Sequence, residues 1–312
     1  MRVPIFFLSF VLPTCIFATT AELGFKQSSQ TLSTSTSLYG NFKDSSENSE
    51  EVNPKLNWNL SYSIDKSNVV DSFGTSIIDN TQSMTVGLGA ETTQHFSFEL
   101  DNNYSVTPEE QMNAVGPSLS VGFRYYFQAP PDDFSPSVKI SFGYGLTNNN
   151  QSFNTLLPAR RKDLSPRPLN GNNIILQTLY SVSLTVSPLD WVSFKGYYAK
   201  YEYNRDVNQF LQFIESPRLA KVSNGIGNAL SGFNIYNWKL ESNFYLFKIW
   251  EFDLSHSVSK IATDSSYSTE NDLIISVELG SWVLGAGVEF ISSSVTDSSS
   301  TTTSLAKLTY NF

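Results

Sequence analysis

Cysteine, charge and long apolar runs are scarce in this chain of 312 residues. Cys15 is the single cysteine, and charged residues make up only 16% of the sequence, below the quarter that is typical of soluble domains. Cys15 lies in a predicted leader, so disulfides, thiol catalysis and cysteine metal sites are excluded from the mature chain. After the leader no run approaches 18 consecutive apolar residues, which excludes a helical membrane span.

Basic clustering is also lacking. The formal net charge is −9, and no basic stripe follows any part of the chain. Nucleic-acid binding needs such a stripe to neutralise phosphates. We therefore predict no nucleic-acid partner.

What the chain does contain is alternation. Its last residues place Ala306, Leu308, Tyr310 and Phe312 on one face and polar residues such as Lys307 between them. Strict alternation predicts a strand that lies between an apolar and a polar medium. The same pattern recurs every 20 to 25 residues back to Lys55, and aromatic residues reach 14% of the sequence.

A final strand that ends on an aromatic residue resembles the closing strand of Gram-negative bacterial outer-membrane β-barrels. In that class the terminal aromatic residue is the signal for the barrel-assembly machinery, a role that the resemblance gives to Tyr310 and Phe312. The resemblance implies an all-β fold, a transmembrane antiparallel up-and-down barrel of 12–14 strands. It also implies an outer-membrane location among lipid and lipopolysaccharide.

The connections agree with such a barrel, in which short periplasmic turns alternate with long outer loops. Short turns are expected near 91–93, 129–135, 187–190, 247–248 and 280–281. Longer polar segments are expected to form loops at 66–80, 104–116, 147–172, 205–231, 261–270 and 293–301. Twelve strands follow from Lys55 onward. Residues 22–53 form either a first hairpin, which gives fourteen strands and is favoured, or a periplasmic extension.

The first 21 residues have the pattern of a secretory signal peptide. Arg2 precedes an apolar run over 4–13, and small residues follow up to Ala21. We expect cleavage near Ala21, so that the barrel occupies residues 22–312.

No catalytic constellation emerges from the two histidines. His95 is expected to face the lumen and His256 the lipid, so they cannot act together. The resemblance to outer-membrane phospholipases requires a paired serine beside a lipid-facing histidine, but Ser255 and Ser257 point to the other face. No metal spacing, phosphate-binding glycine loop or nucleophile elbow is present. We predict that the protein is not an enzyme and has no cofactor or metal.

The residues opposite the apolar face are predicted to line the lumen. They carry charges of both signs with acids in excess, which in an open pore weakly favours cations. The predicted lumen-lining residues include Glu99, Arg124, Lys139, Lys195, Lys239, Glu241, Glu251, Asp253, Glu278, Glu289 and Lys307.

Two functions remain open at the level of the sequence. The favoured one is a porin-like channel for the passive passage of small polar or ionic solutes. The alternative is a closed structural or surface-recognition barrel that acts through the loops at 147–172 and 205–231. The first of these loops carries a basic cluster, suited to lipopolysaccharide phosphates or to a ring at the pore: Arg160, Arg161, Lys162 and Arg167.

Overall fold

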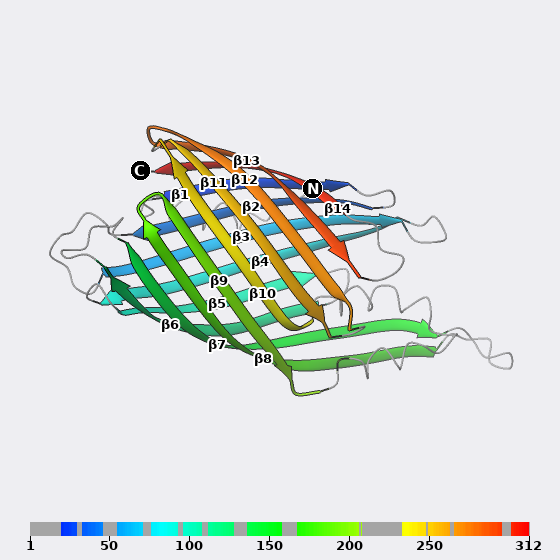
Figure 1. Ribbon diagram of the computed structural model, residues 1–312. Coiled ribbons are helices and arrows are strands. Elements are labelled where there is room, and N and C mark those ends of the chain that lie inside the picture. Colours follow the sequence, from blue (N-terminus) through cyan, green and yellow to red (C-terminus); the bar gives the residue numbers. More distant parts are fainter. Residues whose placement is uncertain are drawn as a thin grey trace.

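Fourteen antiparallel strands close into a single barrel in the computed structural model of this chain (Figure 1). The structure describes residues 20–29, 33–45, 55–70, 76–92, 96–107, 112–127, 136–157, 167–205, 207, 233–247, 249–262, 265–294 and 301–311. The strands are β1 (Thr20–Ser29), β2 (Ser33–Ser45), β3 (Lys55–Val70), β4 (Ser76–Thr92), β5 (Phe96–Thr107), β6 (Met112–Tyr126), β7 (Ser137–Leu157), β8 (Arg167–Leu189), β9 (Val192–Tyr203), β10 (Asn234–Leu246), β11 (Trp250–Ile261), β12 (Tyr267–Leu279), β13 (Trp282–Ser293) and β14 (Thr301–Asn311).

Each strand pairs with its sequence neighbours, and β1 pairs with β14 to close the wall. That seam runs from Thr20 opposite Asn311 to Ser29 opposite Thr302. A closed sheet has no free edge, so its backbone groups are hydrogen-bonded within the wall, as a lipid environment demands. The predicted all-β up-and-down barrel is confirmed. The barrel has fourteen strands and not twelve, because residues from the segment 22–53 form β1 and β2 and not an extension outside the barrel.

The outer face of the wall is apolar and exposed. Leu88 is 61% exposed, Phe123 52% and Leu184 47%. A continuous belt of such side chains belongs in lipid, because a soluble protein does not expose apolar surface on this scale. Trp191, Trp250 and Trp282 are also exposed and lie where strands begin, the position of an interfacial aromatic girdle.

The two ends of the barrel differ. We call the end that holds Thr20, Asn311 and the tight turns from β8 to β9, β10 to β11 and β12 to β13 the turn end, and the opposite one the loop end. At the turn end β12 and β13 are joined through Gly280, whose φ of 67° suits glycine. The turn between β8 and β9 lies at Asp190 and Trp191, slightly later than predicted.

Most connections at the loop end are shorter than predicted, because the strands continue into them; the connection predicted at 205–231 is longer, since β9 ends at Tyr203 and β10 begins at Asn234. β7 runs to Leu157 and β8 begins at Arg167, so most of the segment 147–172, predicted as a loop, is a paired hairpin. Parts of 66–80, 104–116 and 261–270 are likewise strand. Above the apolar belt a strand needs no apolar face. Alternation is therefore lost there while backbone pairing continues, and the sequence signal disappears before the strand ends.

The barrel interior is not a packed apolar core. In the described part of the chain the buried hydrophobic residues are few and scattered: Phe42, Ile175, Val192, Ala199, Val207, Phe233 and Leu305. Among the same residues, no helix is long and apolar enough to cross a membrane.

Candidate functional site

The candidate site is the inner wall of the barrel. Side chains alternate along each strand, so the residues between the exposed apolar ones point inward. The cross-strand registers place every predicted lumen-lining residue on this inner face.

One line of inward-pointing residues joins neighbouring strands directly. We call it the luminal charge row. Its members are paired in turn from β6 to β14: Arg124, Lys139, Thr185, Lys195, Glu241, Ser255, Asp272, Glu289 and Thr303. The charged members on β6, β7 and β9 are basic, whereas those on β10, β12 and β13 are acidic. The inner wall is therefore electrostatically polarised along this row.

Several of the charges are paired across strands. Glu241 lies between two lysines, with its carboxylate 2.9 Å from Lys195 Nζ and 2.8 Å from Lys239 Nζ. Lys307 Nζ lies 3.8 Å from Asp253. The ion pairs of these five residues connect β9 with β10 and β11 with β14. In a partly accessible setting such pairs add little stability individually but hold the side chains against the wall.

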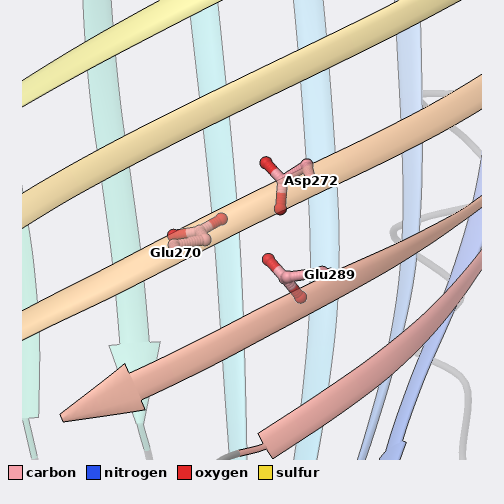
Figure 2. A group of neighbouring side chains, drawn as sticks. All are labelled: Glu270, Asp272 and Glu289. Atoms are coloured by element: carbon pink, nitrogen blue, oxygen red, sulfur yellow. The ribbon is translucent and has the colours of Figure 1, made fainter.

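Three carboxylates converge near the loop-end half of the lumen. Glu270 and Asp272 project from β12 and Glu289 from β13, as Figure 2 shows, with an oxygen of each within 4.8 Å of the others. Lys26 Nζ lies 3.6 Å from Glu289, and Ser255 donates a hydrogen bond to Asp272 at 2.6 Å. We call these three residues the luminal acidic group. Negative charges this close repel one another unless cations offset them, and Lys26 offsets only part of the charge.

Acidic residues outnumber basic ones over the whole described inner face. The bases are Lys26, Arg124, Lys139, Lys195, Lys239 and Lys307; the acids are Glu22, Asp65, Glu99, Asp101, Glu241, Glu251, Asp253, Glu270, Asp272, Glu278 and Glu289. The lysines at 26, 195, 239 and 307 are each within ion-pair distance of an acid. Because the acids outnumber the bases, the described inner face keeps a net negative charge toward the lumen.

Several charged side chains remain accessible inside the barrel, whereas those of Glu289 and Lys307 are only 12% and 15% exposed. The side chain of Lys195 is 44% exposed, that of Lys26 37% and that of Lys239 35%. A barrel that is plugged by its own side chains would bury them. The inner wall therefore presents charged groups that a solute inside the lumen can reach.

Three inner-face residues were missed from the sequence. Glu22 and Lys26 lie on β1, a strand of uncertain assignment, although Leu23 and Phe25 already alternated with them. Glu270 was predicted in a loop, but it lies on β12. For these residues the charged side chain pointed to the lumen, but the sequence did not show where β1 and β12 begin.

Other predicted positions lie elsewhere. Arg167 is the first residue of β8 and not a loop residue, whereas Arg160, Arg161 and Lys162 lie outside the described residues. Tyr310 is in β14, with its ring centroid 4.5 Å from that of Trp282. Phe312 and His95 also lie outside the described residues.

His256 lies on the lipid-facing side of β11. Its Nδ1 is 2.7 Å from the side-chain oxygen of Asn271, and its ring packs against Trp238 at 5.1 Å between centroids. Ser255 and Ser257 alternate with it and point inward, as predicted. The hydrogen bond of His256 is therefore to an amide and not to a hydroxyl nucleophile, and the contacts described for it form no hydrolytic centre.

Comparison with known proteins gave structural likenesses only. No family model matches this chain, and no curated protein matches it in sequence. Among solved structures, the chain is similar to the CymD monoaromatic hydrocarbon channel, with 9% identity, a TM-score of 0.49 and coverage of 96% of this chain and 90% of that one. It is also similar to OccAB1 of Acinetobacter baumannii, with 9% identity, a TM-score of 0.48 and coverage of 93% and 94%. A third is the NanC porin, with 10% identity, a TM-score of 0.41 and coverage of 94% and 100%. At these values no residue role is carried over from them to this chain.

Proposed function

We propose that this protein is a porin-like channel through which small polar or ionic solutes cross the bacterial outer membrane. The observation that carries the proposal is the inner wall: it is charged, it is accessible and it is enclosed by an apolar outer belt. Barrels of eight strands are filled by their side chains, while those of sixteen or more leave a channel. A fourteen-stranded barrel lies between them, which suits a narrow conduit.

The direct test is electrical. Purified, folded protein is inserted into a planar bilayer of neutral lipid in potassium chloride. We expect discrete, ohmic conductance steps. Folded protein that gives no steps over repeated insertions would contradict the channel.

The excess of acids predicts that cations pass more readily than anions. Neutralising the luminal acidic group in the triple variant Glu270→Gln, Asp272→Asn, Glu289→Gln should lower the potassium-to-chloride permeability ratio. A unit charge at about 8 Å in water changes the local ion concentration about twofold, so the triple change should lower the ratio roughly two- to fivefold.

Two matched variants accompany this test, which measures the reversal potential in a salt gradient. Glu202→Gln removes an acid from the exposed ion pair with Lys200 on the outer face and should leave the ratio unchanged. Lys139→Gln removes a luminal base and should raise the ratio. Equal shifts for Glu202→Gln and the triple variant would refute control by the lumen.

Delivery to the outer membrane forms part of the proposal. The leader, with cleavage near Ala21, would export the chain, and Tyr310 with the terminal Phe312 would engage the assembly machinery. The turn end would then face the periplasm and the loop end the cell surface. Removing Phe312 should lower the amount of folded barrel in outer-membrane fractions while the exported chain is still processed. Unchanged assembly would exclude this role for Phe312.

One observation favours a second function, surface recognition. β7 and β8 contain 21 and 23 residues, against 12 in the adjacent β9, and their hairpin extends well beyond β9 at the loop end (Figure 1). Shortening this hairpin by residues 152–171 should abolish binding of a surface partner while conductance persists. A protein that conducts and shows no binding that depends on the hairpin leaves the channel as its function.

A further inference from the structure

A second row of cross-strand partners lies on the outer face of the barrel. Tyr144 pairs with Tyr180, Tyr180 with Lys200, Lys200 with Tyr236, Tyr236 with Lys260 and Lys260 with Tyr267. We call these six residues the tyrosine–lysine row. It crosses from β7 to β12 without interruption, and every member is a tyrosine or a lysine on a face that is otherwise mainly apolar.

On β9 to β12 the row lies near the loop-end ends of the strands, whereas on β7 and β8 the exposed apolar residues Leu146, Ile174 and Leu176 lie further toward the loop end. Lys200 is close to the end of β9, Lys260 is next to last in β11, and Tyr267 is the first residue of β12. A strand of 12 residues, such as β9 or β11, rises by roughly 30 Å when it advances about 3.3 Å per residue at a tilt of about 40°. The apolar belt of such barrels is about 25 Å tall. Lys200, Tyr236, Lys260 and Tyr267 are therefore near the height of lipid headgroups.

The contacts within the row hold cationic and hydroxyl groups side by side. Lys260 Nζ lies 5.7 Å from the ring centroid of Tyr267, and the hydroxyl groups of Tyr236 and Tyr267 are hydrogen-bonded across it. Tyr236 also stacks on Tyr198 at 6.3 Å. Lys200 Nζ is 2.7 Å from Glu202, and both side chains are more than half exposed. The described outer face around the row thus carries two ammonium groups, one carboxylate and several phenol hydroxyls.

Further toward the turn end, past Trp238 and the pair of His256 with Asn271, the same strands present an apolar surface. Phe142 is 53% exposed, Leu240 54% and Leu254 44%. The combination is that of an amphiphile site: donors and positive charge at headgroup height, with an apolar wall for acyl chains below. A soluble anion would contact only the hydrogen-bond donors and positive charges, and not the apolar wall.

We propose that the tyrosine–lysine row binds the phosphorylated headgroup of lipopolysaccharide in the outer leaflet. This inference rests on the proposed orientation, with the loop end at the cell surface. Lys260 and Lys200 contact the phosphate groups, the tyrosine hydroxyls donate hydrogen bonds to the same oxygens, and the acyl chains lie along the wall below. On binding, Lys200 exchanges its ion pair with Glu202 for one with the doubly charged phosphate, which attracts it more strongly.

The test uses full-length protein refolded in a neutral detergent without lipid. Binding of phosphorylated lipid A is measured by thermal shift and by native mass spectrometry, for the wild type and for Lys200→Gln with Lys260→Gln. Each lysine near an anionic lipid surface contributes about fivefold in affinity, so the double variant should bind about 25-fold more weakly. Lys66→Gln is the matched control, because Lys66 is an exposed outward lysine of β3 outside the row, and it should bind as the wild type does.

Three results would overturn the proposal: equal affinity of the double variant, equal binding of dephosphorylated lipid A, or an equal effect of inorganic phosphate. The last would mean that the row takes a free anion. Conductance is measured on the same preparations in bilayers without lipopolysaccharide. Loss of lipid binding with normal conductance, or the reverse, separates failure of this inference from failure of the channel.

Discussion

Gly116 shows how closely two strands of this barrel approach. A Cβ at this position would lie 1.8 Å from the carbonyl oxygen of Leu146 and 2.6 Å from the Cα of Thr147, both of which are backbone atoms of β7. Backbone cannot turn aside as a flexible side chain can. Only glycine therefore fits here without separating β6 from β7.

Gly116→Ala should consequently destabilise the barrel. Overpacking of this kind costs about 1–3 kcal/mol in the free energy of unfolding. Gly196→Ala is the control, because its nearest atom is Leu240 Cδ2 at 3.8 Å, and there the change should stay within about 1 kcal/mol and can be stabilising. Guanidinium unfolding in micelles, followed by tryptophan fluorescence, measures both. Equal stability of the two variants would show that β7 can move.

At the residue scale, much of the lumen was predictable. Lys239 and Glu241 are assigned inward by alternation alone, because a one-residue error would turn every apolar neighbour inward. Which charges meet was not predictable. Glu241 contacts Lys195 on the preceding strand, and that contact depends on the register between β9 and β10.

At the element scale, the seam between β1 and β14 decides the strand count. The registers place Leu23 opposite Leu308 and Leu308 opposite Leu284 of β13. The first hairpin was ambiguous from sequence because its apolar residues are few. The structure settles it: β1 pairs with both β14 and β2, and β2 pairs with β3, so that no strand has a free edge in lipid.

Engineered cysteines test this seam in a chain that also carries Cys15→Ser. Leu23→Cys with Leu308→Cys should form a disulfide in the folded barrel, since directly opposed Cα atoms lie about 4.5–5.5 Å apart. Leu23→Cys with Leu284→Cys should not, since two strand spacings are about 10 Å. Non-reducing electrophoresis of folded protein reads out both. Crosslinking of the second pair but not the first would contradict the fourteen-strand seam.

On the scale of the whole molecule, the net charge of −9 is partly concentrated inside the barrel. The basic members of the luminal charge row lie on β6, β7 and β9, and its acidic members on β10, β12 and β13. In the proposed channel, a solute in the lumen meets this arrangement across water. Its effect therefore depends on how far charge acts through salt solution.

Cation preference should weaken as salt rises. The screening length is about 10 Å at 0.1 M and about 3 Å at 1 M, so the luminal charges act across the pore only in dilute salt. The potassium-to-chloride permeability ratio, measured at a fixed tenfold gradient, should fall toward unity as the mean concentration rises over this range. A ratio that does not change would indicate a tight ion-binding constriction in place of a wide charged lumen.

The sequence alone predicts that each strand has one apolar and one polar face and that acids outnumber bases on the polar one. It could do so because alternation is a local property that lipid and water impose on every strand. The tertiary structure alone decided the closure through β1, the length of β7 and β8, and the two rows of partners inside and outside the wall. These depend on the register between neighbouring strands and, for β1, on pairing with β14 at the other end of the chain; the alternation within one strand does not contain that information.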